Sequence, residues 1–286
     1  MHRHLLHNGQ ILDTTERSLA AGQVGLLSGW GVFTTIKVVD GVLFAWERHW
    51  ARMMRDAKLM HVPMPSDREE LHRDLLRLIE SNQAPNATMR VVIVRNEGGM
   101  WQGPSTGREY DVIALTADLK NWGRSVRLDF VPNARHAASP FSGTKILSWS
   151  MNLTWLEAAQ KRGFDEVVLL NERGEVAECT SANIFAAFGS EVRTPPIAAG
   201  CLPGITREVL LSEAHVEGIR LVEQTLMPQD LFDADEVFIT STTRDLLSVS
   251  QLGDRSRENR GVMRERLSDA FGRYIDAYVE SRRVPV

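Results

Sequence analysis

The stretch GFDEVVLLNERGEVAECTSANIF, residues 163–185, determines how the second half of the chain folds. The apolar run 167–170 is followed by Asn171 and then Gly174, and both residue types favour a tight turn. We therefore predict a β-hairpin that turns between Asn171 and Gly174, followed by a strand at 183–188. The second strand of the hairpin ends at Glu178, where a carboxylate and a run of small residues follow an apolar segment.

Outside this stretch the apolar patterns of strands and helices alternate without an internal repeat, which predicts a mixed α/β (α+β) fold. Asp40-Gly41 lies between two β-branched runs and predicts a second hairpin, because Asp-Gly fits a two-residue turn. Apolar residues on one helix face predict a helix at 67–82. Further helices are predicted between the second hairpin and Met60 and at 148–163, 205–218 and 257–278, and further strands at 88–99, 109–119, 126–132 and 236–241.

The polar segment that begins with KNWG, at 120–124, separates two patterned regions. We expect a small α+β domain at 1–119, a linker at 120–124, and a larger, mostly β domain with surrounding helices at 125–286.

Composition excludes several classes of function. The 286 residues include 33 Lys and Arg against 37 Asp and Glu, a net charge of −4, so nucleic acid is not an expected partner. The two cysteines, Cys179 and Cys201, stand in no metal-ligand spacing, and we expect no metal and a reducing, cytoplasmic location. No secretory signal is visible and no apolar run is long enough to span a membrane, so no membrane partner is expected.

Three features suggest chemistry, although each also has an ordinary structural interpretation. Lys145 lies among small, apolar and aromatic residues, where an amine loses hydration and becomes a nucleophile suited to imine formation; otherwise it is a surface charge. Glu178 is either a solvated strand end or a carboxylate that points into a pocket and pairs with a cation, such as a protonated pyridine nitrogen.

The third feature is a set of groups that suit a phosphate. Gly204, Ile205 and Thr206 begin a predicted helix, where free N–H groups and the helix dipole attract an anion, although many helices begin this way without a ligand. The hydroxyls of Ser241 and Thr242 and the guanidinium of Arg52 are further candidates, with turn formation and a solvated charge as the alternatives. An imine-forming amine, a carboxylate for a pyridinium and an anion site are together what pyridoxal 5′-phosphate (PLP) requires.

Long segments of the chain also resemble the class IV, or fold-type IV, PLP-dependent aminotransferases, which include branched-chain and D-amino acid aminotransferases and 4-amino-4-deoxychorismate lyases. The resemblance runs through five motifs that cover most of the sequence. They are GLLSGWGVFTTIKVVDGVLFAWERHWARM, GTKILSWSMN, GFDEVVLLNERGEVAECTSANIF, TPPIAAGCLPGITREVLL and EVFITSTTRDL.

The resemblance implies a role for each candidate. Lys145 is similar to the lysine that carries the cofactor as an aldimine, and Glu178 to the acid that pairs with the pyridine nitrogen. The residues similar to those that hold the phosphate and the ring are Arg52, Leu202, Gly204, Ile205, Thr206, Ser241 and Thr242. The resemblance further implies two α/β domains, with PLP bound by the C-terminal one, and a homodimer with its active site near the subunit interface.

Departures from the family pattern bear on the substrate. Trp30 and Thr34 stand where the family often has an aspartate and a glutamate, and Ser150 stands where branched-chain enzymes commonly have a tyrosine. The positions expected to face the substrate are Phe33, Lys37, Arg95 and Trp101, and Arg95 has a strand-end surface arginine as its alternative interpretation.

The expected reaction is a ping-pong transamination between an amino acid, of branched-chain L- or D-type, and a 2-oxo acid. The alternatives are a 4-amino-4-deoxychorismate lyase that releases pyruvate and 4-aminobenzoate, and a non-catalytic scaffold with the same fold. Cys179 has no predicted role beyond its small size.

Overall fold

The computed structural model describes residues 1–286 except 17–18, 20–21, 101–106, 258–260 and 283–286. Its described residues form two compact units. The first contains the chain up to Lys120, the segment Lys145–Trp149 and the residues from Tyr278 onward; the second contains Asn121–Thr144 and Ser150–Ala277. The first unit thus contains two short segments, Lys145–Trp149 and the described residues from Tyr278 onward, that lie within the range expected for the C-terminal domain, and the expected domain bounds stay a prediction.

The first unit is built on a six-stranded antiparallel sheet with the strand order β2-β1-β6-β5-β3-β4. Its strands are β1 (His4–His7), β2 (Gln10–Asp13), β3 (Gly31–Val39), β4 (Val42–Leu43), β5 (Ala87–Arg95) and β6 (Tyr110–Ala117). The predicted turn between β3 and β4 is confirmed, because Asp40 and Gly41 both adopt positive φ angles, 49° and 81°. The strands predicted at 88–99 and 109–119 are confirmed, with ends shorter than expected.

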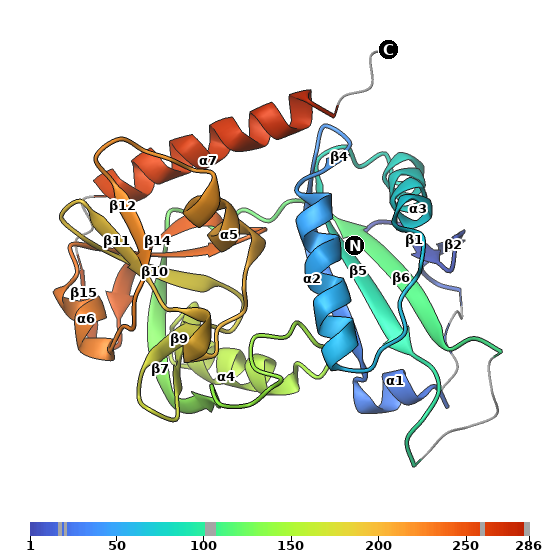
Figure 1. Ribbon diagram of the computed structural model, residues 1–286, viewed down its shortest axis with the longest axis horizontal. Coiled ribbons are helices and arrows are strands. Elements are labelled where there is room, and N and C mark those ends of the chain that lie inside the picture. Colours follow the sequence, from blue (N-terminus) through green and yellow to red (C-terminus); the bar gives the residue numbers. More distant parts are fainter. Residues whose placement is uncertain (17–18, 20–21, 101–106, 258–260, 283–286) are drawn as a thin grey trace. The chain divides into compact units, whose positions relative to one another are not determined.

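Helices α2 (Trp46–Leu59) and α3 (Arg68–Ser81) cover one face of this sheet (Figure 1). The Asp67 side chain caps α3 by accepting hydrogen bonds from the N–H groups of Glu69 and Glu70. The apolar face of α3, with Leu71 and Leu75 at its centre, is buried in the core of the first unit. A short helix, α1 (Val24–Ser28), was not predicted.

The second unit contains a nine-stranded sheet with the order β12-β11-β10-β13-β14-β7-β8-β9, in which β15 pairs with β14. The strands are β7 (Ser125–Arg135), β8 (Glu166–Asn171), β9 (Val176–Cys179), β10 (Asn183–Phe188), β11 (Glu191–Thr194), β12 (Arg220–Glu223), β13 (Glu236–Ser241), β14 (Asp245–Leu252) and β15 (Arg255–Ser256). The predicted hairpin β8–β9 is confirmed, with the Gly174 N–H donating to the Asn171 carbonyl over 3.0 Å.

The helices of the second unit are shorter than predicted. The structure has α4 (Ser150–Lys161), η1 (Ile197–Ala199), α5 (Ile205–Ser212), α6 (Pro228–Asp233) and α7 (Val262–Glu280). The prediction that α5 continues to Gly218 is wrong, because the chain turns back after Ser212 so that β12 can pair with β11. The predicted start of the last helix at Arg257 is also wrong: α7 begins at Val262, where the buried Glu236 carboxylate accepts the Met263 and Arg264 N–H groups over 3.0 and 3.1 Å.

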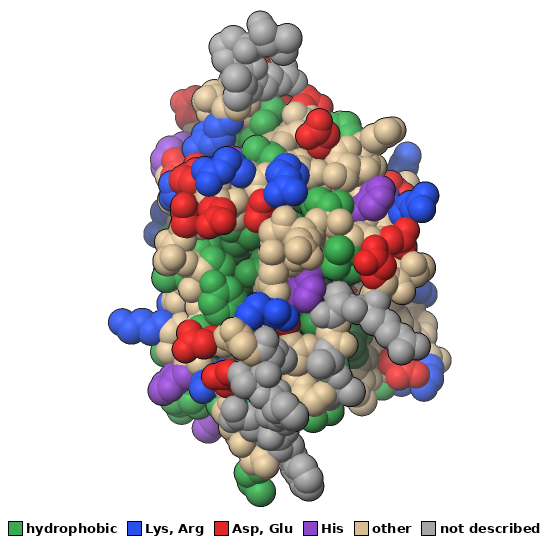
Figure 2. Space-filling view, turned by 90° about the vertical axis from the view of Figure 1, so that its right-hand side faces the viewer, with side chains coloured by type: hydrophobic (Ala, Val, Ile, Leu, Met, Phe, Trp, Pro, Cys, Tyr) green, Lys and Arg blue, Asp and Glu red, His purple; other side chains and the backbone are tan. Residues whose placement is uncertain are grey.

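Charged side chains are mixed on the protein surface. On the face in Figure 2 acidic and basic side chains are interspersed around smaller apolar areas, in keeping with the net charge of −4. Among the described residues, no helix is both long and apolar enough to cross a lipid bilayer.

Candidate active site

Lys145 lies on a short segment that packs beside β3 of the first unit. Ile146 forms an antiparallel bridge with Val32, and the Lys145 carbonyl accepts the Phe33 N–H over 3.0 Å. The Lys145 N–H donates over 3.0 Å to Oδ2 of Asp56, a carboxylate that is 1% exposed and also accepts a hydrogen bond from Arg55. The backbone on both sides of the Lys145 side chain is therefore fixed.

The Lys145 amine lies against an aromatic ring. Its Nζ atom is 4.5 Å from the centroid of the Phe33 ring, and the guanidinium carbon of Arg90 is 4.0 Å from the same centroid. The edge of Trp149 also contacts Phe33, with ring centroids 6.4 Å apart. The structure therefore brings together the predicted catalytic lysine and Phe33, one of the predicted substrate positions.

Arg52 is held within the same unit by Thr34, the residue at which the sequence departs from the family pattern. Its guanidinium donates to Thr34 Oγ1 over 2.8 Å, and the Thr34 hydroxyl is 2.6 Å from Nδ1 of His49. His49 is completely buried, and burial together with the positive charges of Arg52 and Lys145 holds its pKa well below the ordinary value. A neutral His49 accepts the Thr34 hydrogen and leaves the Thr34 oxygen to accept from Arg52.

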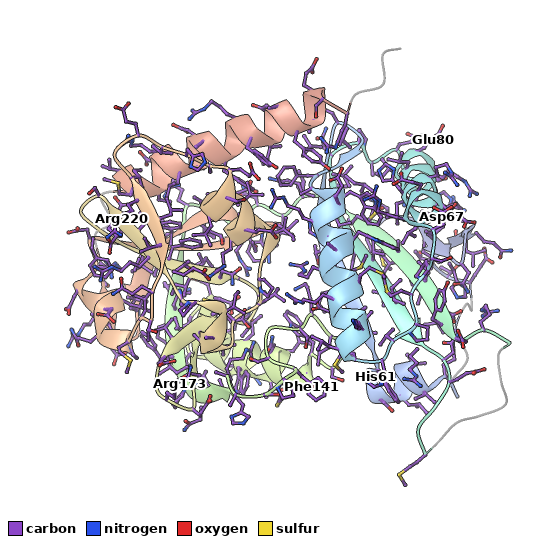
Figure 3. The ribbon with its side chains drawn as sticks, in the orientation of Figure 1. His61, Asp67, Glu80, Phe141, Arg173 and Arg220 are labelled. Carbon is purple, nitrogen blue, oxygen red and sulfur yellow. The ribbon has the colours of Figure 1, made fainter. Side chains whose placement is uncertain are left out.

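The other predicted substrate positions have surroundings that differ from those of Phe33. Arg95 stacks on Trp30, 4.1 Å from the ring centroid, and donates to the carbonyls of Glu97 and His61, both over 2.6 Å. His61 lies just beyond the end of α2 (Figure 3). Lys37 lies on β3, partly exposed. Trp101 lies outside the described residues. The contacts of Arg95 therefore fix local structure, and its role as a substrate position stays a prediction.

In the second unit Glu178 and Leu202 contact each other directly. Glu178 is 8% exposed, and its Oε2 atom accepts the Leu202 N–H over 3.0 Å. The Leu202 carbonyl accepts from the Asn183 side chain over 2.8 Å. Glu178 on β9 and Asn183 on β10 thus hold the N–H and the carbonyl of Leu202. The sequence reasoning did not single out Asn183.

The start of α5 is shaped in a way that suits an anion. Gly204 precedes the helix, no side chain caps it, and Ile205 and Thr206 in its first turn are each 3% exposed. A Cβ atom at Gly204 would collide with the Asn183 side-chain oxygen, so a larger residue there would displace Asn183 from its contact with Leu202. The first N–H groups of a helix have no acceptor within it, and they carry the positive end of its dipole.

Ser241 and Thr242 follow β13 in a turn that a buried network fixes. The Ser241 hydroxyl accepts the Arg244 N–H over 3.2 Å, and the Arg244 guanidinium donates to the Ser181 hydroxyl over 2.8 Å. Glu166, which is fully buried, accepts from Ser181 over 2.7 Å and pairs with Arg244 over 3.4 Å. This network ties the turn of Ser241 and Thr242 to the turn that follows Glu178.

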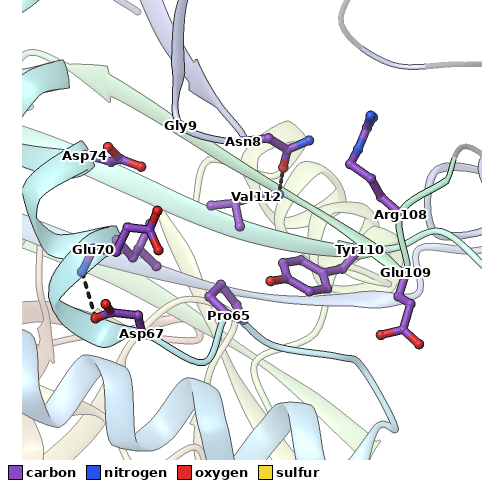
Figure 4. Close-up of a pocket in the computed structure, with 11 residues that line it drawn as sticks. Asn8, Gly9, Pro65, Asp67, Glu70, Asp74, Arg108, Glu109, Tyr110 and Val112 are labelled. Carbon is purple, nitrogen blue, oxygen red and sulfur yellow. Dashed lines mark hydrogen bonds between the residues drawn. The ribbon is translucent and has the colours of Figure 1, made fainter.

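A separate cavity of about 370 Å³ lies in the first unit between the start of α3, the β1–β2 turn and the start of β6 (Figure 4). Tyr110 and Val112 contribute apolar surface to it, and Glu70 and Asp74 contribute carboxylates. None of the predicted site residues lines this cavity, so it plays no part in the candidate active site.

Cys179 belongs to the core of the second unit. It is completely buried among apolar side chains, and burial, together with the charge of Glu166, raises the pKa of its thiol well above the ordinary value. Cys179 therefore contributes to the apolar core of the second unit.

Comparison with known proteins identifies the family. The sequence model of one protein family, the class IV aminotransferases, matches residues 31–252 of this chain. The chain belongs to the class IV aminotransferases. The matched range contains both the Lys145 segment and the Glu178 and Leu202 contact.

Three proteins illustrate the similarity of this aminotransferase to its relatives. A protein of Methanocaldococcus jannaschii whose name assigns it to the branched-chain-amino-acid aminotransferases is 29% identical over 271 residues, which cover 92% of this chain and 93% of the relative. The D-alanine aminotransferase of Bacillus licheniformis is 26% identical, covering 87% and 88%. The solved structure of the branched-chain amino acid aminotransferase of Escherichia coli has a TM-score of 0.86 at 25% identity and covers 96% and 95%.

Proposed function

We propose that this aminotransferase uses PLP, bound through Lys145, to transfer an amino group from an amino acid to a 2-oxo acid. The observation that carries the proposal is the setting of Lys145, whose backbone is fixed by Asp56 and β3 and whose amine lies 4.5 Å from the Phe33 ring centroid. A lysine held in this way presents its amine in a defined position beside an apolar surface, as imine chemistry needs.

The described residues include hydrogen-bond donors suited to the phosphate of PLP and an acceptor suited to its ring nitrogen. The uncapped start of α5, with Gly204 packed against Asn183, suits a phosphate, because N–H groups without intrahelical acceptors remain there. The buried Glu178 carboxylate suits a protonated pyridine nitrogen, since a carboxylate accepts strong hydrogen bonds from a cationic N–H group. Arg52, Ser241 and Thr242 supply further donors for a phosphate.

When bound, PLP supplies an aldehyde carbon that reacts with amines and a ring that accepts the electron pair left at the substrate Cα. The Lys145 amine would join the cofactor and, when free, would act as the base that removes the proton from the substrate Cα. Glu178 would hold a proton at the ring nitrogen, and Leu202 would pack against the ring. The phosphate would be held by Ile205, Thr206, Ser241, Thr242 and Arg52, which would fix the position of the ring.

For the substrate we propose an amino acid of the branched-chain L- or D-type. Relatives named for branched-chain amino acids and for D-alanine support this range. Phe33, which contacts the Lys145 amine, places an apolar ring beside the proposed reactive group, and this setting favours an aliphatic side chain. We further propose a cytoplasmic homodimer, which a sedimentation or light-scattering measurement of the molecular mass would test.

The experiment is a comparison of Lys145→Ala with Lys161→Ala, a matched removal of an exposed lysine on α4. We expect Lys145→Ala to lose turnover and to incorporate no PLP after borohydride reduction, which traps a cofactor joined to a lysine. Lys161→Ala should behave as wild type. Turnover retained by Lys145→Ala would refute the assignment.

A screen of half-reactions tests the substrate proposal. Each L- or D-amino acid is added to the PLP-loaded enzyme, and a fall in the visible absorbance of the cofactor reports amino transfer. We expect aliphatic amino acids to react. Pyruvate and 4-aminobenzoate appearing from 4-amino-4-deoxychorismate without an amino acceptor would favour a lyase, and a protein that stays colourless with PLP would favour a scaffold.

A further inference from the structure

Glu178 has a cationic partner, Arg135, that the sequence reasoning did not single out. Arg135 is the last residue of β7, and its Nε atom donates to Glu178 Oε1 over 2.9 Å. The other carboxylate oxygen accepts the Leu202 N–H over 3.0 Å. The side chains of Arg135 and Glu178 are only 17% and 11% exposed, so water screens the pair weakly.

Further contacts hold the Arg135 guanidinium in place. Its NH1 group donates to the Ala134 carbonyl and to the Asn152 side-chain oxygen, both over 3.2 Å. The Asn152 amide in turn donates to the Thr180 carbonyl over 3.0 Å. Arg135 therefore spans β7, α4 and the turn after β9, and it approaches Glu178 from a direction set by all three.

These contacts fix the plane of the carboxylate. A carboxylate has about four lone-pair positions on its two oxygens, and Arg135 and the Leu202 N–H occupy one on each oxygen. A side chain held at both oxygens cannot turn about its last bond without losing a hydrogen bond, one of which is assisted by charge. The remaining lone pairs keep a fixed direction.

We propose that Arg135 is a positioning residue, which holds the Glu178 carboxylate in the orientation that accepts a hydrogen bond from the ring nitrogen of PLP. This inference rests on the proposed function and extends it. Arg135 would orient the PLP ring through Glu178, without touching the cofactor itself. The guanidinium also compensates the charge of Glu178 before a cofactor binds, so the buried carboxylate is accommodated in the free protein.

The test compares Arg135→Gln and Arg135→Lys with Arg127→Gln. Arg127 also lies on β7 and also pairs with a carboxylate, but its partner is Asp165 and its side chain is 48% exposed. Three quantities are measured: the Kd for PLP, the visible circular dichroism of the bound cofactor, which reports a fixed ring orientation, and kcat and KM for an amino donor.

For Arg135→Gln we expect about a tenfold weaker Kd for PLP, a reduced visible dichroism, and kcat lowered about 10- to 100-fold with KM nearly unchanged, because the lost interaction acts in the transition state. Arg135→Lys keeps the charge and should recover part of each signal. Arg127→Gln should match wild type.

Wild-type Kd, dichroism and kcat in a folded Arg135→Gln would overturn the inference. If Arg135→Gln does not fold, Arg135→Lys decides: a Kd and dichroism equal to wild type would then reject the positioning role. A wild-type protein that binds no PLP rejects the proposed function itself, so the two failures are distinguishable.

Discussion

His49 is a residue whose surroundings oppose its protonation. It is completely buried beside Thr34, and its pKa is lowered by burial and by the charges of Arg52 and Lys145. In the unfolded chain a histidine takes up a proton near pH 6.5, whereas the folded protein keeps His49 neutral. The unfolded state therefore binds more protons below that pH, and the stability of the fold declines as the pH falls.

His49→Gln tests this dependence. The variant removes the titrating group, so the decline in the free energy of unfolding below pH 6.5 should become shallower by up to about 1.4 kcal/mol per pH unit. Urea unfolding of the first unit at pH 7.0, 6.0 and 5.5 measures the slope. His136→Gln is the control, because His136 is 69% exposed, and its slope should equal that of wild type. Equal slopes in His49→Gln and wild type would show that His49 does not carry the effect.

At the scale of elements, the start of β3 is packed too closely to admit a side chain. The Gly31 carbonyl accepts the Leu147 N–H over 3.0 Å, which joins the Lys145 segment to β3. A Cβ atom at Gly31 would lie 2.5 Å from Leu147 Cδ1 and would also collide with the Ile93 carbonyl oxygen. Because a backbone oxygen in a strand cannot move aside cheaply, this glycine keeps β3, β5 and the Lys145 segment together.

Gly31→Ala should therefore lower the free energy of unfolding by about 2 kcal/mol or more. The matched variant is Gly272→Ala in α7, where an added Cβ meets no atom within 4 Å. That change should raise the stability by about 0.5–1 kcal/mol, the difference in helix propensity between alanine and glycine. Urea unfolding midpoints measure both, and a Gly31→Ala midpoint at or above wild type would contradict the packing argument.

At the scale of the whole chain, the C-terminal residues are tied to the beginning of α2. The Tyr278 hydroxyl accepts the Trp46 N–H over 3.2 Å and donates to Glu47 over 2.7 Å. Arg282 pairs with Glu47 over 2.9 Å. Burial and the Glu47 carboxylate raise the pKa of Tyr278; burial opposes ionisation of Glu47, but hydrogen bonds from Tyr278 and Arg282 lower its pKa. The first unit thus includes residues from both ends of the sequence.

Tyr278→Phe should destabilise the first unit by about 1–3 kcal/mol, because the buried Trp46 N–H loses its acceptor. Tyr110→Phe, which removes a phenol hydroxyl from the cavity of Figure 4, is the comparison and should cost less. Thermal unfolding of the two variants measures the difference. Equal melting temperatures would mean that the C-terminal residues do not support the first unit.

The sequence by itself determined the elements and the types of chemistry. Local turn geometry predicted both hairpins, because Asp40-Gly41 and Asn171 to Gly174 favour turns whatever surrounds them. The residue types at Lys145 and Glu178 suggested an imine-forming amine and a carboxylate for a cation, and the motifs around them led to the class IV aminotransferases, to which the chain belongs.

Only the tertiary structure decided which residues hold these groups. Asp56 fixes the Lys145 backbone, Asn183 holds Leu202 and Arg135 pairs with Glu178, and each contact joins residues that are distant in the sequence. It also decided that α7 begins where Glu236 accepts its N–H groups, rather than at Arg257. Turns depend on the backbone preferences of neighbouring residues, which a sequence displays directly. Buried polar contacts depend on which segments fold against each other, and one sequence read along its length does not specify that pairing.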